Sequence, residues 1–325
     1  MTGVKLSRTV WARARLAGTI VAVIALVWSL GAGPFLDGIR SVDGSALAGG
    51  TGLAVLTTVC CAWRWRLVAA GLGIELSLPD AVAAYYRSLF LNLTLPGGIV
   101  GDVHRGISHG REVSDVGRAL RAVAWERFAG QVVQAFLTVV VLLALPSPAR
   151  SAMPLVGIVV VVALLGVLLL ARDQPAGARS AWARIRGAAA RDVREGLLAP
   201  TVWPGIALAS ALVVCGHALT FLIAARTAGV GASQSELLPI ALLVMLVMVL
   251  PSVGGWGPRE GATAWAFAAA GLGAAQGVAT GVVYGVIVLV ASLPGAAVLM
   301  VSWSRRRIRA PERTEAPPVE GAARA

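Results

Sequence analysis

Two stretches of this chain place an acidic and a basic residue just after a proline and several glycines, and each interrupts a long apolar run. Residues 93–105 read Leu-Thr-Leu-Pro-Gly-Gly-Ile-Val-Gly-Asp-Val-His-Arg, and residues 249–260 read Val-Leu-Pro-Ser-Val-Gly-Gly-Trp-Gly-Pro-Arg-Glu. An arginine binds a phosphate through two N–H groups and stays charged when it is desolvated. The chemistry that these stretches favour is therefore the binding of an anion in apolar surroundings.

Both stretches are expected to leave helical geometry, because glycine frees the backbone and proline removes a donor. Gly/Pro interruptions at corresponding places in two halves of a membrane protein are typical of a transporter's substrate site. The candidate substrate-binding residues are Asn92, Gly97, Gly98, Gly101, Asp102, Arg105, Gly254, Gly255, Gly257, Arg259 and Glu260. Pro96, Pro251, Glu126 and Arg127 are expected to support them.

The charged residues allow two interpretations. Asp102 and Arg105 share a face of a helix at this spacing, so they either hold a headgroup, with Arg105 on its phosphate, or neutralise each other. Neighbours on a helix point in different directions, so Arg259 and Glu260 are expected to do more than bridge each other. If the two breaks meet near the midplane of the membrane, both arginines could contact one anionic headgroup.

Glu126 and Arg127 follow in the next apolar run. They are expected to pair with the broken segments, because an unpaired buried charge is costly. His104 and His109 are expected near the cytoplasmic surface, and His217 is expected to be a hydrogen-bonded core residue.

Composition assigns the chain to a membrane. It is 57% hydrophobic and 14% charged, with a mean hydropathy of +0.79, and several windows exceed the roughly 18 apolar residues typical of a transmembrane helix. The net charge of +12 comes from basic clusters between apolar runs. This is the pattern of cytoplasmic loops and argues against a nucleic-acid partner. The three cysteines have neither disulfide nor metal spacing and are expected to pack in the core; no motif indicates a cofactor or metal.

The arginine clusters set the predicted topology. Full crossings are expected over about residues 15–34, 45–63, 119–145, 153–171, 202–224 and 275–303. The Trp-Arg-Trp-Arg cluster at 63–66 is expected at the cytoplasmic interface, followed by an interfacial stretch at 67–79. The segments around Pro96 and over 237–271 must each return to the side from which they start.

The predicted fold is thus an all-α polytopic integral membrane protein of the cytoplasmic membrane. It has about six full transmembrane helices and two oppositely inserted re-entrant helical hairpins, like an inverted repeat. Residues 1–310 form a single membrane domain, and residues 311–325 form a disordered cytoplasmic tail. Both termini are expected in the cytoplasm.

The motifs resemble those of the lysylphosphatidylglycerol synthase transmembrane-region family, also called flippase-like proteins. The likeness lies in Pro-Gly-Gly-x-x-Gly-Asp-x-x-Arg at 96–105, the pair at 126–127 and Pro-Ser-x-Gly-Gly-x-Gly-x-Arg-Glu at 251–260, and it covers about residues 15–305. In bifunctional members such a domain moves aminoacylated lipid between leaflets, and a separate soluble domain makes that lipid. With 325 residues this chain leaves no room for the soluble domain, so we expect a stand-alone member.

The resemblance implies lipid handling, and three functions stay open. The first is a flippase or transporter for a lipid, or a lipid-linked intermediate, with an anionic headgroup: a phospholipid, a glycolipid or a polyprenyl-phosphate lipid. The second is a non-transporting partner of a glycosyltransferase or another cell-envelope biosynthesis enzyme. The third is an enzyme acting on lipid phosphate through Asp102, Glu260 or the histidines. We predict a transporter without enzymatic activity.

Overall fold

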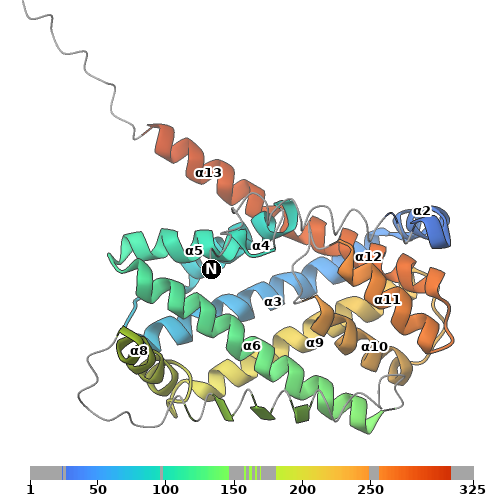
Figure 1. The fold of residues 1–325 in the computed structure, drawn as a ribbon. Coiled ribbons are helices and arrows are strands. Elements are labelled where there is room, and N and C mark those ends of the chain that lie inside the picture. Colours follow the sequence, from blue (N-terminus) through green and yellow to red (C-terminus); the bar gives the residue numbers. More distant parts are fainter. Residues whose placement is uncertain are drawn as a thin grey trace, which may run out of the picture.

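The computed structural model describes residue 24, residues 27–95, 98–145, 181–248 and 256–308, and seven positions between 157 and 169. Every element named in this part of the chain is a helix, as predicted (Figure 1). The helices are α2 (Gly33–Ser41), α3 (Gly44–Gly71), α4 (Leu78–Thr94), α5 (Val100–Glu112), α6 (Val116–Ala144), α8 (Ala181–Gly196), α9 (Trp203–Thr227), α10 (Gln234–Val247), α11 (Pro258–Ala269), α12 (Ala274–Ser292) and α13 (Pro294–Ile308).

Four stretches are long and apolar enough to cross a membrane: Gly44–Gly71, Val116–Ala144, Trp203–Thr227 and Ala274–Ser304. They match four of the predicted crossings, and their length follows from a rise of about 1.5 Å per residue against a hydrocarbon core of about 30 Å. The predicted crossings at 15–34 and 153–171 lie largely outside the described residues, as does the predicted tail at 311–325. The chain is a helical multi-pass membrane protein.

Helix α3 corrects the predicted end of the second crossing. Its N-cap Asp43 accepts a hydrogen bond from the Ala46 N–H, and the helix runs on to Gly71 through the residues expected at the interface. Arg64 and Trp65 are buried within the helix bundle. The reason is that Arg64 has a buried carboxylate partner on another helix, so its charge does not have to lie at the membrane surface.

The predicted last helix is divided in two. α12 ends at Ser292 and α13 begins at Pro294, whose missing N–H suits the first turn of a helix. α13 packs on α4, where a Cβ on Gly295 would lie 2.1 Å from the backbone oxygen of Tyr86. Its far end extends away from the bundle (Figure 1).

Both predicted breaks interrupt helices. α4 ends at Thr94 and α5 begins at Val100, while α10 ends at Val247 and α11 begins at Pro258. Gly98 and Gly257 have φ values of 67° and 96°, which side chains other than glycine rarely adopt. These glycines therefore allow the chain to turn between the two helices of each pair.

In each broken pair, the helix ends away from the break lie at one end of the bundle, and the two pairs use opposite ends; we say that a pair opens at that end. Ile74, before α4, and Ala119, after α5, pack in one cluster with the start of α9 and the end of α8; we call this the α8 end. Leu237 of α10 and Phe267 of α11 pack in another cluster with Ala46 of α3; we call this the α2 end.

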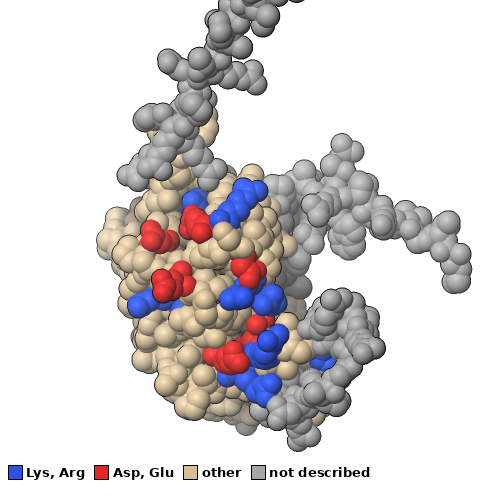
Figure 2. All heavy atoms as spheres, turned by 90° about the vertical axis from the view of Figure 1, so that its left-hand side faces the viewer, with Lys and Arg blue, Asp and Glu red and all other residues tan. Residues whose placement is uncertain are grey.

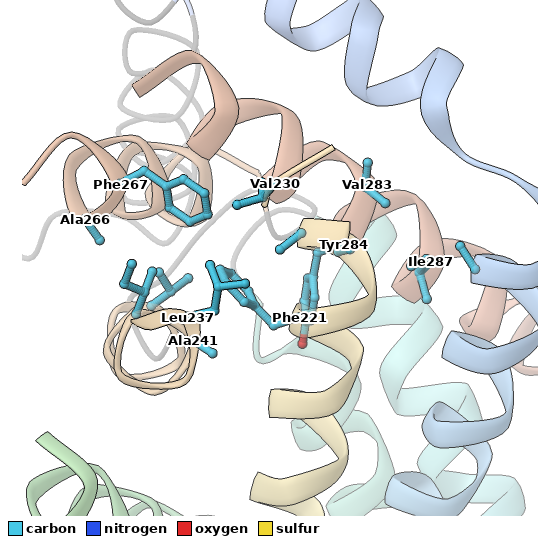
Figure 3. Packing of buried hydrophobic residues seen from close by; sticks show 14 residues of the cluster. Phe221, Val230, Leu237, Ala241, Ala266, Phe267, Val283, Tyr284 and Ile287 are labelled. Atoms are coloured by element: carbon cyan, nitrogen blue, oxygen red, sulfur yellow. The ribbon is translucent and has the colours of Figure 1, made fainter. Parts of the chain in front are cut away.

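Figure 3 shows the second cluster, in which Phe267, Leu237 and Phe221 point toward one another from α11, α10 and α9. The face of the bundle at the α8 end carries both basic and acidic side chains (Figure 2).

Candidate functional site

Glu126 of α6 lies at the centre of the first ionic network. It is fully buried, and its Oε1 accepts hydrogen bonds from the Tyr85 hydroxyl at 2.9 Å and from Arg64 Nη2 at 2.6 Å. Its Oε2 accepts from Arg105 Nη2 at 2.8 Å. Arg64 also donates to Ser210 Oγ at 3.1 Å. One carboxylate thus connects four other helices, α3, α4, α5 and, through Arg64, α9.

Asp102 extends this network to the first break. Its Oδ1 accepts from Ser88 Oγ and from Arg105 Nη2, both at 3.1 Å. Its Oδ2 accepts from Asn92 Nδ2 at 3.0 Å and from Arg127. The predicted pair of Asp102 and Arg105 is confirmed, and so is the expected pairing of residues 126 and 127 with the broken segment.

Asn92 and Gly101 hold the two helices of the first pair together. Asn92 Oδ1 accepts the Gly101 N–H at 2.7 Å, which satisfies a donor in the first turn of α5. A Cβ on Gly101 would lie 2.0 Å from the backbone oxygen of Ser88. Gly101 therefore serves close packing in this conformation, whereas it was expected to contact the substrate.

The network carries more positive than negative charge. Among the described ion pairs, Arg64, Arg105 and Arg127 face the two carboxylates of Asp102 and Glu126, so these five side chains sum to one positive charge. Four of these five residues are buried, but the side chain of Arg127 is 46% exposed. Arg127, which pairs with Asp102, is therefore the member of this network whose side chain is exposed.

Arg105, by contrast, is enclosed by the protein. It is 0% exposed, and its Cζ lies 4.6 Å from the ring centre of Trp65 and 4.1 Å from that of Tyr85. Cation–π contacts of this kind hold the planar group between aromatic rings. The contact with a phosphate that the sequence favoured for Arg105 is closed in this conformation.

The second network lies at the start of α11. Arg259 donates to Glu260 Oε1 from Nε at 2.8 Å and from Nη2 at 2.6 Å, and Glu260 Oε2 accepts the Gly257 N–H at 2.7 Å. The two neighbours bridge each other and, as expected, do more than that, because Glu260 also accepts the Gly257 N–H. Glu260 folds back over the helix N-terminus as in a capping box, and the long arginine side chain curls to the same place.

Aromatic rings and a glycine enclose Arg259. Its Cζ lies 5.0 Å from the ring centre of Trp256 and 5.7 Å from that of Tyr284. A Cβ on Gly285 would lie 2.2 Å from Arg259 Nη2, so this glycine leaves the room that the guanidinium fills. The Tyr284 hydroxyl lies 3.0 Å from His217 Nδ1, as expected for a hydrogen-bonded core histidine.

Helix α9 touches both networks. Ser210 contacts Arg64 of the first, and His217 contacts Tyr284, which lies beside Arg259 of the second. Seven residues separate the two contacts, so they share a face of α9 about 10 Å apart along its axis. The networks are neighbours that remain separate.

The chain matches the family model described as "Lysylphosphatidylglycerol synthase TM region" over residues 15–295. It belongs to this family. No curated protein matches the chain. Both ionic networks lie within the matched region.

The structure divides the predicted site residues into two groups. Asn92, Gly101, Asp102, Arg105, Glu126 and Arg127 belong to the first network, with Gly98 in the adjoining break. Gly257, Arg259 and Glu260 belong to the second. Pro96, Gly97, Pro251, Gly254 and Gly255 lie outside the described residues.

Sequence reasoning missed Arg64, Tyr85 and Ser210. Arg64 was counted with the basic residues at the interface, although the apolar residues 67–70 that follow it are a signal that the helix continues. His109, expected near the surface, is 7% exposed and lies edge-on to Trp65. Cys60 is buried as expected, but Cys215 is exposed on α9.

These arrangements are suited to holding charge. Asp102, Glu126 and Glu260 each accept hydrogen bonds from an arginine and from at least one further donor, so their lone pairs are engaged. Among the described residues, no group of three or more His, Cys, Asp or Glu could hold a metal ion. The accessible group is a guanidinium, which binds an oxyanion through hydrogen bonds.

Proposed function

We propose that this protein is a transporter that moves a lipid with an anionic headgroup between the leaflets of the cytoplasmic membrane. The observation that carries the proposal is the excess of one arginine in the first network, together with the exposed side chain of Arg127 beside a broken helix pair. An ionisable group in a membrane helix is costly and typically faces a partner or a water-filled path.

The charge favours an anion as ligand. Arg127 binds Asp102 through Nη2, its side chain is 46% exposed, and its remaining N–H groups can meet a phosphate. Hydrogen bonds between charged groups contribute about 1.5–3 kcal/mol each, so one such contact discriminates an acidic lipid from a neutral one.

The two broken pairs favour movement over simple binding. They open at opposite ends of the bundle, and each holds an arginine close to its break. In transporters with inverted repeats, broken helices from the two halves form a site that is reached alternately from each side. We place the cytoplasm at the α8 end, where Arg66, Arg111 and Arg118 are exposed, because basic residues gather on cytoplasmic loops.

A lipid-flipping assay in proteoliposomes tests the proposal. We expect Arg127→Gln to slow the flipping of a fluorescent phosphatidylglycerol about tenfold, which corresponds to about 1.4 kcal/mol, and Arg127→Lys to restore it in part because lysine keeps the charge without the planar fork. Arg118→Gln is the control. Its side chain is 45% exposed and also pairs with an aspartate, but it lies at the start of α6, away from the break.

The proposal fails if wild-type vesicles do not flip the lipid faster than protein-free vesicles. It also fails if the two glutamine variants are equally active. Thermal unfolding of each variant shows whether a slow variant is still folded.

A further inference from the structure

A groove of about 680 Å³ lies at the α2 end, between the start of α3 and the end of α9 and away from both ionic networks. Asp43, Ser45 and Arg226 line it near the helix ends, and Leu53, Leu219 and Ile223 line it further along. On α9 the lining residues recur with helical spacing, so the groove follows one face of that helix.

The lining changes from polar to apolar along the helices. Leu53 lies ten residues beyond Asp43, or about 15 Å along α3, and Leu219 lies seven residues before Arg226, or about 10 Å along α9. Such a gradient matches an amphiphile whose headgroup lies at the helix ends and whose hydrocarbon chain lies along the leucines. The α2 end is thus suited to a membrane lipid.

The polar part of the groove carries one charge of each sign. Asp43 Oδ1 accepts from the Ala46 N–H at 2.7 Å, and this bond lowers the pKa of Asp43, so the carboxylate is charged at neutral pH. Arg226 is exposed and donates from Nη1 to the Val230 carbonyl at 2.8 Å. Asp43 Oδ1 also accepts from Ser45 Oγ at 2.8 Å. No ion pair joins Asp43 to Arg226 among the described contacts, so the second oxygen of Asp43 and the remaining N–H groups of Arg226 can bind a ligand.

We infer that this groove binds one zwitterionic phospholipid, with its ammonium group at Asp43, its phosphate at Arg226 and an acyl chain along Leu53 and Leu219. A purely anionic headgroup would gain the contact with Arg226 but would meet the negative charge of Asp43. The groove therefore differs from the first network, where the surplus charge is positive. The inference does not depend on the proposed transport.

Native mass spectrometry of the detergent-solubilised protein, titrated with phosphatidylethanolamine or phosphatidylglycerol, tests this site. We expect the wild type to bind phosphatidylethanolamine more tightly. Leu219→Trp should weaken that binding at least tenfold, because the indole fills the apolar part of the groove. Leu143→Trp, at an exposed leucine of another membrane-spanning helix, should leave it unchanged.

Asp43→Ser tests the headgroup contact without removing the helix cap, because serine also accepts the backbone N–H at this position. It should remove the preference for phosphatidylethanolamine, a change of about five- to tenfold in the ratio of the two affinities. The inference is overturned if the wild type retains both lipids equally, if Asp43→Ser keeps the preference, or if Leu219→Trp binds as the wild type does.

Discussion

Glu126 is the residue on which the first network depends most. It is fully buried, and two arginines and a tyrosine bind its two oxygens. Burying such a group is costly, and removing one partner of a buried pair costs about 3–5 kcal/mol because the other charge loses its compensation. The network therefore holds its helices in one arrangement as long as this carboxylate is present.

We expect Glu126→Gln to lower the free energy of unfolding by about 3 kcal/mol, because Arg64 and Arg105 lose their shared counter-charge. Denaturation in mixed micelles, followed by circular dichroism, measures the change. Glu112→Gln is the control, since its side chain is 73% exposed and its ion pair among the described residues is with His109, at 3.5 Å; it should change stability by less than about 0.5 kcal/mol. A loss below about 1 kcal/mol for Glu126→Gln would contradict the central role of this residue.

Local spacing predicted some of these contacts and missed others. Asp102 and Arg105 lie three residues apart, so a helix brings them together whatever the rest of the fold does. Arg64 and Glu126 lie 62 residues apart and meet only because α3 packs beside α6. Without that partner, a lone arginine after an apolar run looks like the end of a membrane crossing.

At the scale of helices, glycines determine how closely α12 approaches α11. Gly277, Gly281 and Gly285 recur every four residues on one face of α12, a spacing typical of close helix contacts in membranes. The structure gives them unequal roles. A Cβ at Gly277 would lie 2.6 Å from the backbone oxygen of Thr263, whereas at Gly281 the nearest atoms are 3.5 Å away.

This difference predicts opposite outcomes for two matched variants. Gly277→Ala should destabilise the protein by about 1–3 kcal/mol, because the helix backbones must separate to admit the methyl group. Gly281→Ala should be neutral or stabilising by up to about 1 kcal/mol, because alanine favours a helix over glycine. Thermal unfolding of both variants in the same detergent makes the comparison. If Gly277→Ala is as stable as Gly281→Ala, the helices are not packed as described.

The breaks in the helices were the best-predicted elements. Glycine and proline act locally, so the interruptions between α4 and α5 and between α10 and α11 follow from the sequence. The division at Pro294 was missed, because a proline within a long apolar run is also compatible with a continuous, kinked membrane helix.

At the scale of the whole molecule, the proposed transport requires the α2 end and the α8 end of the bundle to lie on opposite sides of the membrane. Cysteine labelling in a variant lacking Cys60, Cys61 and Cys215 tests this. A membrane-impermeant maleimide should label Gly231→Cys, in the exposed loop after α9, on intact cells. It should label Glu75→Cys, in the exposed loop before α4, only after permeabilisation. Labelling of both positions on intact cells would contradict the proposed orientation.

The sequence predicted several members of the two networks, such as Asp102 and Glu260, but not how they are grouped. The expectation that Arg105 and Arg259 share one headgroup follows from the likeness of the two motifs, which says nothing about how each guanidinium packs. Both are buried, each with its own carboxylate and its own aromatic rings. Side-chain packing of this kind is decided by contacts between helices that are distant in the chain.

Helix α9 is a direct physical link between the two networks. Its contacts through Ser210 and His217 lie on one face of a single rigid rod, so sliding that rod along its axis changes the geometry at Arg64 and at Tyr284 together. If a ligand at the first network favours one position of α9, it changes the affinity of the second network for its own ligand. A ligand at the second network must then change the affinity of the first network by the same factor. Two sites on one helix can in this way act in alternation without touching each other.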